Sequence, residues 1–236
     1  MERKATQTVM LVRRPGLIMW ALWVLIAVLV GIVTAFAVTR IYEATGNLIW
    51  ISLVPPLIVG VMGGVIQEIV LRFYLADLGR GEWTIPTALG ITFGWFASLP
   101  LVRLVPEMLL GLFEPPPPLW IGLVFRVLGA GVVGVVAGVA QWQLLRHYVS
   151  SDAYRAGPSL IWVASSGVAW LLSEIIRIVL VSYSAGYFPT PTANHVANAE
   201  GWIFAIPVTG LITGAALIWL LWTRPAAKVR NLPTFN

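Results

Sequence analysis

Apolar stretches dominate the chain and are separated by short polar segments. Six of them contain the roughly 20 mostly apolar residues that an α-helix needs to cross a bilayer. They are Leu17–Thr39, Leu48–Tyr74, Thr84–Val105, Leu119–Tyr148, Pro158–Tyr183 and Trp202–Trp222. Nothing alternates between apolar and polar residues with the period of two that a lipid-facing β-barrel requires. The pattern therefore predicts an all-α membrane protein in which residues 1–236 form one membrane domain with six transmembrane helices.

Three glycine pairs recur along the chain at a nearly constant interval. The pairs are Gly60 and Gly64, Gly134 and Gly138, and Gly210 and Gly214, and their first members lie 74 and then 76 residues apart. The sequence around the first two pairs also matches, because Gln67 and Arg72 stand where Gln141 and Arg146 stand. Such an internal repeat predicts three parallel two-helix hairpins, at about 17–74, 84–148 and 158–222, around a pseudo-threefold axis.

Glycines four residues apart leave a groove on a helix into which another backbone can pack closely. We therefore expect the three pairs to serve helix packing, with the second, fourth and sixth helices meeting near the central axis. Pro55, Pro56 and Pro207 precede two of the grooves and should kink their helices, and kinked helices can line a cavity.

The composition agrees with a membrane protein and narrows the choice of partners. Charged residues make up 11% of the chain, whereas a soluble domain has about a quarter, so the lipid bilayer must be the solvent for much of the surface. The net charge of +5 comes from basic residues scattered at helix ends, which does not predict a nucleic-acid partner. Cysteine is absent, which removes disulfides and thiolate metal ligands.

The distribution of lysine and arginine predicts the orientation. If both termini lie on one side, that side holds eleven of the basic residues and the other side, with the outer half of the membrane, holds four. The positive-inside rule then places both tails, 1–16 and 224–236, in the cytoplasm of a bacterial inner-membrane protein. The longest outer connection, Ser184–Glu200, is expected to carry structure outside the membrane, and Pro115–Pro118 predicts a stiff, extended linker.

Ionisable residues within the apolar segments are the strongest candidates for a functional site, because each is costly in lipid. At about 1.5 Å per residue, Arg126 lies roughly 10 Å below the outer face, and Glu174 lies at the same depth in the next segment. We predict an ion pair between them, with Arg177 one turn beyond as a competing partner. Arg103 and Glu107, four residues apart, can pair along one helix.

Two interpretations of these charges stay open. They form either a substrate or ion site or a satisfied buried network, and the network is preferred. Gln67 and Gln141 extend the candidate polar site, because they lie one turn inside the membrane and need partners. Those partners would be backbone carbonyls or each other across the axis, at the mouth of a cavity.

The sequence contains no complete motif of a known class of intramembrane enzyme. Glu68 and Arg72 share part of the Glu-Glu-xxx-Arg signature of intramembrane CAAX-processing proteases, but Gln67 occupies the first position. The histidines, His147 at a helix end and His195 in a connection, lie outside the predicted helices' interior. We therefore predict no catalytic residue, no metal site and no cofactor.

The pattern Gly-xxx-Gly-xx-Gln-Trp-xx-Leu-Arg, followed by a polar loop and a tryptophan-containing span, resembles uncharacterised multi-pass membrane proteins of cyanobacteria and green filamentous bacteria. The resemblance covers most of Gly60 to Trp222, and its most specific part is Gly138 to Arg146, while Glu68 stands where the pattern has tryptophan. It implies the fold and carries no catalytic residue across.

Two functions follow from these observations. The first is a non-catalytic accessory or scaffold protein that associates with lipids, with other membrane proteins or with itself, for which twelve tryptophans and three glycine grooves are suited. The alternative is a small-solute or ion transporter or channel, with its polar site near Arg126 and Glu174.

Overall fold

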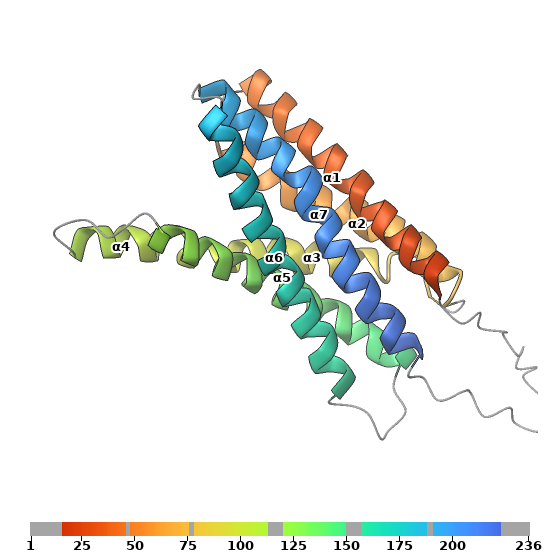
Figure 1. The fold of residues 1–236 in the computed structure, drawn as a ribbon. Coiled ribbons are helices and arrows are strands. Elements are labelled where there is room, and N and C mark those ends of the chain that lie inside the picture. Colours follow the sequence, from red (N-terminus) through yellow and green to blue (C-terminus); the bar gives the residue numbers. More distant parts are fainter. Residues whose placement is uncertain are drawn as a thin grey trace, which may run out of the picture.

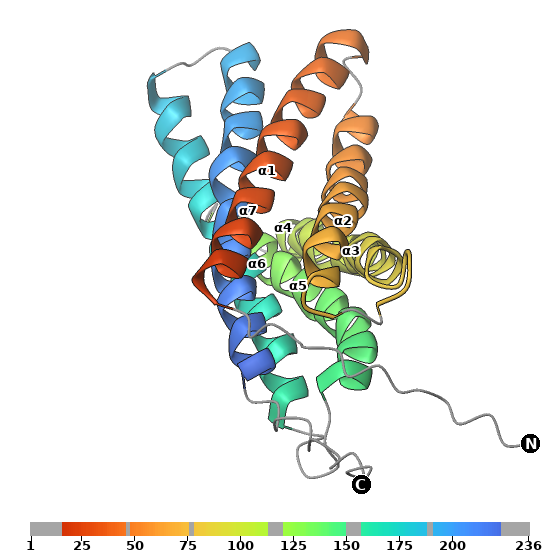
Figure 2. The same ribbon diagram turned by 90° about the vertical axis from the view of Figure 1, so that its right-hand side faces the viewer.

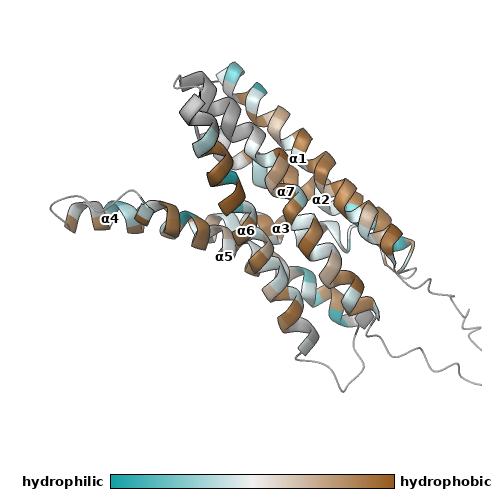
Figure 3. Cartoon of the chain, in the orientation of Figure 1, coloured by the Kyte–Doolittle hydropathy of each residue, from teal (hydrophilic) through white to brown (hydrophobic). Residues whose placement is uncertain are grey.

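The computed structural model describes residues 16–45, 48–75, 78–112, 120–149, 157–187 and 191–222. These residues form α1 (Leu17–Thr45), α2 (Leu48–Arg72), α3 (Thr84–Leu99), the π-helix η1 (Pro100–Leu104), α4 (Val105–Leu112), α5 (Trp120–Val149), α6 (Gly157–Tyr187) and α7 (Pro191–Trp222) (Figure 1). Six helical stretches are long and apolar enough to cross a membrane, with α3, η1 and most of α4 acting as one. Apolar residues run along these helices (Figure 3). The prediction of an all-helical protein with six candidate spans is confirmed.

The helices pack in a closed ring. Each helix contacts its neighbour in the order α1, α2, α3, α5, α6, α7, and α7 returns to contact α1. The helices α1, α3 and α6 begin at one end of the ring, and α2, α5 and α7 end there (Figure 2). We call this end the termini side. At the opposite end, the tip side, the helices diverge: α4 points away from α1, α6 and α7 (Figure 1).

The glycine pairs pack against helices other than those expected. A Cβ atom added to Gly60 in α2 would lie 2.9 Å from the Cα of Ala88 in α3, and one added to Gly138 in α5 would lie 3.1 Å from the Cα of Val163 in α6. A Cβ added to Gly214 in α7 would lie 2.9 Å from Cδ1 of Trp23 in α1. Through their glycines, α2 packs onto α3, α5 onto α6 and α7 onto α1, so the expected meeting of α2, α5 and α7 at a central axis is wrong.

The physical reason lies in the direction of the glycine face. The residues that precede the second glycine of each pair, Gly63, Ala137 and Thr213, line a cavity in the interior of the ring, and so does Gly210 of the third pair. One residue turns a helix face by about 100°. The grooves of α2 and α5 therefore point sideways along the ring, where the backbone of the next helix lies against them, whereas side chains of α1 lie against the groove of α7.

The connection expected at Ser184–Glu200 is largely helical. The helix α6 continues to Tyr187 and α7 begins at Pro191. Proline is well placed in the first turn of a helix because its missing N–H would have no partner there. The segment also contains four alanines, and alanine is the strongest helix former. The predicted proline linker at 115–118, and both tails except Gly16, lie outside the described residues.

The third span contains a short π-helix just before its expected end at Val105, and it continues beyond that residue as α4. Val105 donates its backbone N–H to the carbonyl of Pro100, five residues earlier. Pro106 has no N–H, so it cannot close the next α-helical hydrogen bond, and a wider turn forms before the helix resumes. The helices α2 and α7 run on through Pro55, Pro56 and Pro207.

Three tryptophans close the termini side of the ring. Trp23 in α1, Trp83 immediately before α3 and Trp162 in α6 are almost completely buried. Their rings meet edge to face, with centroids 6.0 Å apart for Trp23 and Trp83 and 6.1 Å apart for Trp83 and Trp162. This geometry suits the quadrupoles of aromatic rings. Leu71, Leu145 and Leu217 are fully buried on the same side, so the core is densest there.

Candidate functional site

The intramembrane charges gather into one cluster between α5 and α6. Arg126 in α5 contacts Glu174 in α6, with 2.6 Å between Nε and Oε1. Arg177, one turn farther along α6, donates to both carboxylate oxygens of Glu174, at 2.8 Å from Nε and 2.6 Å from Nη2. The predicted ion pair between Arg126 and Glu174 is therefore present, and Arg177 shares the same carboxylate.

The cluster of Arg126, Glu174 and Arg177 is largely buried and is in contact with an aromatic side chain. The side chains of Glu174 and Arg177 are about nine-tenths buried, whereas that of Arg126 is 38% exposed. The guanidinium of Arg177 lies 5.3 Å from the ring centroid of Trp202 in α7, a cation–π contact. Gly201 in α7 makes room for the stem of Arg177, because a Cβ there would lie 2.7 Å from Cγ of that arginine.

A cavity of about 90 Å³ lies beside the cluster on the tip side. Its walls come from α3, η1, α5, α6 and α7, and include Trp95, Trp170 and Trp202 together with the three charged residues. The indole N–H of Trp95 is buried and has no hydrogen-bond partner. The cavity thus combines aromatic walls with a charged cluster, and one wall residue, Trp95, has a donor that is not used within the protein.

Arg103 does not belong to this site. It lies on η1, is exposed, and does not line the cavity. Glu107 in α4 is exposed too, and within the described part of the chain the two residues form no ion pair, so the predicted pairing is wrong. The π-helix explains the difference, because its wider turn changes the angle between residues four apart.

A second cavity, of about 60 Å³, lies at the centre of the ring and receives side chains from all six spans. Gln67 and Gln141 both line it, but their partners differ from those expected. Gln67 accepts a hydrogen bond from the indole of Trp83 at 3.0 Å, and Gln141 donates to the hydroxyl of Thr87 at 3.0 Å. They therefore bond to side chains of α3 and its N-terminus rather than to backbone carbonyls or to each other.

The central cavity also contains polar groups that have no partner in the protein. The indole N–H of Trp162 and the hydroxyl of Ser166, both more than 95% buried, make no hydrogen bond. An unsatisfied buried polar group is destabilising and calls for an explanation. Trp170 and Ile206 line both cavities, so the two spaces adjoin.

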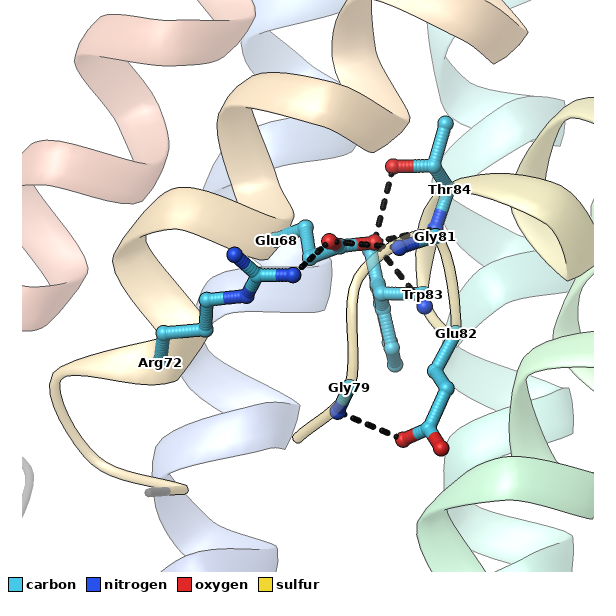
Figure 4. A network of polar contacts seen from close by, with 7 residues as sticks. All are labelled: Glu68, Arg72, Gly79, Gly81, Glu82, Trp83 and Thr84. Carbon is cyan, nitrogen blue, oxygen red and sulfur yellow. Dashed lines mark hydrogen bonds and ion pairs between the residues drawn. The ribbon is translucent and has the colours of Figure 1, made fainter. Parts of the chain in front are cut away.

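Glu68 forms a different kind of polar centre on the termini side. Its carboxylate accepts hydrogen bonds from the backbone N–H groups of Gly81, Trp83 and Thr84 and from the Thr84 hydroxyl, at 2.8–3.2 Å, and from Arg72 at 2.7 Å (Figure 4). The first N–H groups of α3 would otherwise lack partners. Glu68 of α2 thus caps α3 from the previous hairpin, with Gly81 at a φ of +80° shaping the turn.

Replacing Glu68 with glutamine is expected to lower the free energy of unfolding by about 2–3 kcal/mol, because an amide offers one acceptor and turns its NH₂ group toward other donors. Thermal unfolding of the purified protein in detergent, followed by tryptophan fluorescence, measures the change. Glu43→Gln is the matched control, because its ion pair with Arg40 is exposed on both sides and should be worth less than about 1 kcal/mol. Equal stability of the two variants would contradict the capping role.

Sequence reasoning found the charged cluster but missed the tryptophan cluster and the cap. Trp23, Trp83 and Trp162 are 60 and 79 residues apart, so the glycine interval does not reveal them. Their burial near the starts of three helices is a tertiary feature. Among the described residues, no three His, Asp or Glu side chains gather as a metal site would require.

The chain matches no protein-family model, no curated protein and no solved structure. Its class is therefore defined by the fold alone, as a helical protein with six candidate membrane spans. The resemblance to multi-pass proteins of cyanobacteria and green filamentous bacteria stays a prediction.

Proposed function

We propose that this protein is a non-catalytic membrane transporter that moves a small solute along the interior of its helix ring. The observation that carries the proposal is the pair of adjoining cavities, whose walls hold buried polar groups without protein partners. Ligand sites are typically concave and mostly apolar, with a few polar groups that orient the ligand. A purely structural bundle has no need to leave such groups unsatisfied.

The two ends of this route differ. On the tip side, the first cavity lies beside the partly exposed Arg126. On the termini side, Trp23 and Trp162 line the central cavity, and their rings pack against that of Trp83. The arrangement resembles one state of an alternating-access cycle, in which a solute site is reached from one side while the other side is shut.

A cavity-filling variant tests the proposal. Gly63 lines the central cavity, and a Cβ there would approach no atom closer than 4.0 Å. Gly63→Leu should therefore fill the cavity, leave the fold intact and reduce solute flux into liposomes at least tenfold. Flux would be measured with a panel of small labelled anions, cations and neutral solutes.

Gly122→Leu is the matched control for the flux experiment, because a Cβ at Gly122 meets nothing within 4 Å and this glycine lines neither cavity. It should transport as the wild type does. If no solute in the panel crosses faster than through protein-free liposomes, or if Gly63→Leu transports normally, the proposed function is wrong.

Our proposal includes three hairpin repeats, at about 17–74, 84–148 and 158–222, around a pseudo-threefold axis. Two features support it: each glycine pair meets the first helix of the following hairpin, with α7 meeting α1 in turn, and Trp23, Trp83 and Trp162 come from the starts of the three hairpins. Gly63, Ala137 and Thr213 occupy matching places in the wall of the central cavity.

We further propose that both termini are cytoplasmic in a bacterial inner membrane, as the distribution of lysine and arginine favours. The chain has no cysteine, so a single Asn236→Cys variant reports the position of the C-terminus without background. A membrane-impermeant maleimide should label it only after the cells are opened. Labelling of intact spheroplasts would reverse the topology and place the tip side in the cytoplasm.

The accessory or scaffold function remains a second proposal. It is supported by large apolar side chains that are exposed on the outside of the ring, such as Phe36, Phe93 and Trp219, although lipid covers such residues equally well. Co-purification of a defined stoichiometric partner in mild detergent, together with the absence of flux for every solute in the panel, would favour it over transport.

A further inference from the structure

In the tip-side cavity, two positively charged arginines, Arg126 and Arg177, share one negatively charged carboxylate, that of Glu174. Glu174 accepts two hydrogen bonds from Arg177, one at each carboxylate oxygen, and its Oε1 also lies 2.6 Å from Nε of Arg126. Within the described residues, Glu174 is the carboxylate that Arg126 contacts. A single negative charge therefore serves two guanidiniums, which leaves the cluster with a net positive charge.

Arg126 is also the member of the cluster that a ligand can reach. Its side chain is 38% exposed, against 8% for that of Arg177. Arg126 approaches Glu174 through Nε, and the two terminal nitrogens of its guanidinium form a planar fork of donors. Such a fork matches two oxygens of a carboxylate or another planar oxyanion, and binds them with charge-assisted hydrogen bonds.

The remaining polar groups of the cavity favour a ligand that accepts hydrogen bonds. Trp95 has a buried N–H without a partner. The hydroxyl of Ser173 is already bonded to the carbonyl of Ala205 and to Thr209, and the hydroxyl of Ser98 donates to the carbonyl of Trp95. The groups still available are therefore mainly donors, which an anion satisfies and a cation does not.

The size of the cavity limits the ligand. The volume of about 90 Å³ leaves room for a small ligand, since about 10–15 Å³ of space is enough to hold one water molecule. Its walls of tryptophan and aliphatic side chains strengthen electrostatic contacts by excluding water. A monovalent oxyanion of a few heavy atoms fits this space better than a sugar or a nucleotide does.

We infer that the cavity beside Arg126 and Glu174 binds a small planar oxyanion, such as a short carboxylate, held by the terminal nitrogens of Arg126 and the indole N–H of Trp95. The inference rests on the proposed function and names its solute class. Glu174 orients Arg126 and is not itself a ligand contact. The anion is a free solute rather than a lipid phosphate, because the cavity lies between α3, α5, α6 and α7 within the ring.

Binding of radiolabelled acetate to the protein in nanodiscs of phosphatidylcholine tests the inference. Formate and nitrate should displace acetate, while acetamide, its neutral counterpart, and methylammonium should not. Arg126→Gln should weaken binding at least tenfold, and Trp95→Phe, which removes only the N–H, by about three- to tenfold. Arg103→Gln, at an exposed arginine outside the cavity, should bind acetate as the wild type does.

Displacement by acetamide, or wild-type binding by both Arg126→Gln and Trp95→Phe, overturns the inference. Displacement of acetate when phosphatidylglycerol replaces part of the phosphatidylcholine also overturns it, because the site then takes a lipid headgroup. Flux of neutral solutes without acetate binding rejects the oxyanion but keeps the proposed transport. Acetate binding without flux of any solute keeps the oxyanion site and rejects transport.

Discussion

The variant Glu174→Gln is expected to lower the free energy of unfolding by about 3–5 kcal/mol. Glutamine leaves Arg126 and Arg177 facing each other without the carboxylate that now lies 2.6 Å from each of them. An unpaired charge in an apolar interior is far costlier than a well-packed neutral group, because neither water nor a counter-ion solvates it. The midpoint of thermal unfolding in detergent measures the loss.

Two further variants separate this explanation from a general effect of mutation. Arg126→Gln should cost less than Glu174→Gln, because Glu174 keeps both hydrogen bonds from Arg177. The double variant Arg126→Gln/Glu174→Gln should be more stable than Glu174→Gln alone, since it removes one of the two repelling cations. Glu107→Gln, at an exposed carboxylate of α4, is the control. A double variant less stable than Glu174→Gln would contradict the shared-carboxylate interpretation.

The variant Gly134→Leu should prevent the recovery of folded protein, or destabilise it by at least about 3 kcal/mol. A Cβ at this position would collide with the carbonyl oxygen of Ser166 and lie 2.9 Å from the Cα of Gly167 in α6. Both obstacles are backbone, so no side chain can move aside, and α5 and α6 would have to separate. Yield of monodisperse protein in size-exclusion chromatography and the unfolding midpoint report the result.

Gly122→Leu gives the same substitution on the same helix at a site where a Cβ meets nothing within 4 Å. It should leave yield and stability near those of the wild type, apart from the higher helix propensity of leucine. Equal behaviour of the two variants would mean that close packing through the glycine groove contributes little to the fold.

The sequence by itself was enough to predict the helices, because spanning a bilayer depends on the length and apolar character of one segment. It was also enough for the ion pair of Arg126 and Glu174. Their depths follow from a fixed rise per residue, and consecutive helices joined by a short connection tend to be neighbours. Ser184–Glu200 carries structure as expected, but the sequence did not show that this structure continues the two neighbouring helices. A segment rich in turn-forming residues can continue a helix when that helix is packed at its other end.

Only the tertiary structure decided which surfaces meet. The spacing of Gly60 and Gly64 identifies a groove, but its partner depends on how far α2 is rotated about its axis, which is set by the packing of the whole ring. The same reason hid the contact of Trp23, Trp83 and Trp162, whose spacing differs from that of the glycines because the connections differ in length. It also hid Glu68 as the cap of α3, since the N–H groups it accepts from become neighbours only after α2 and α3 pack together.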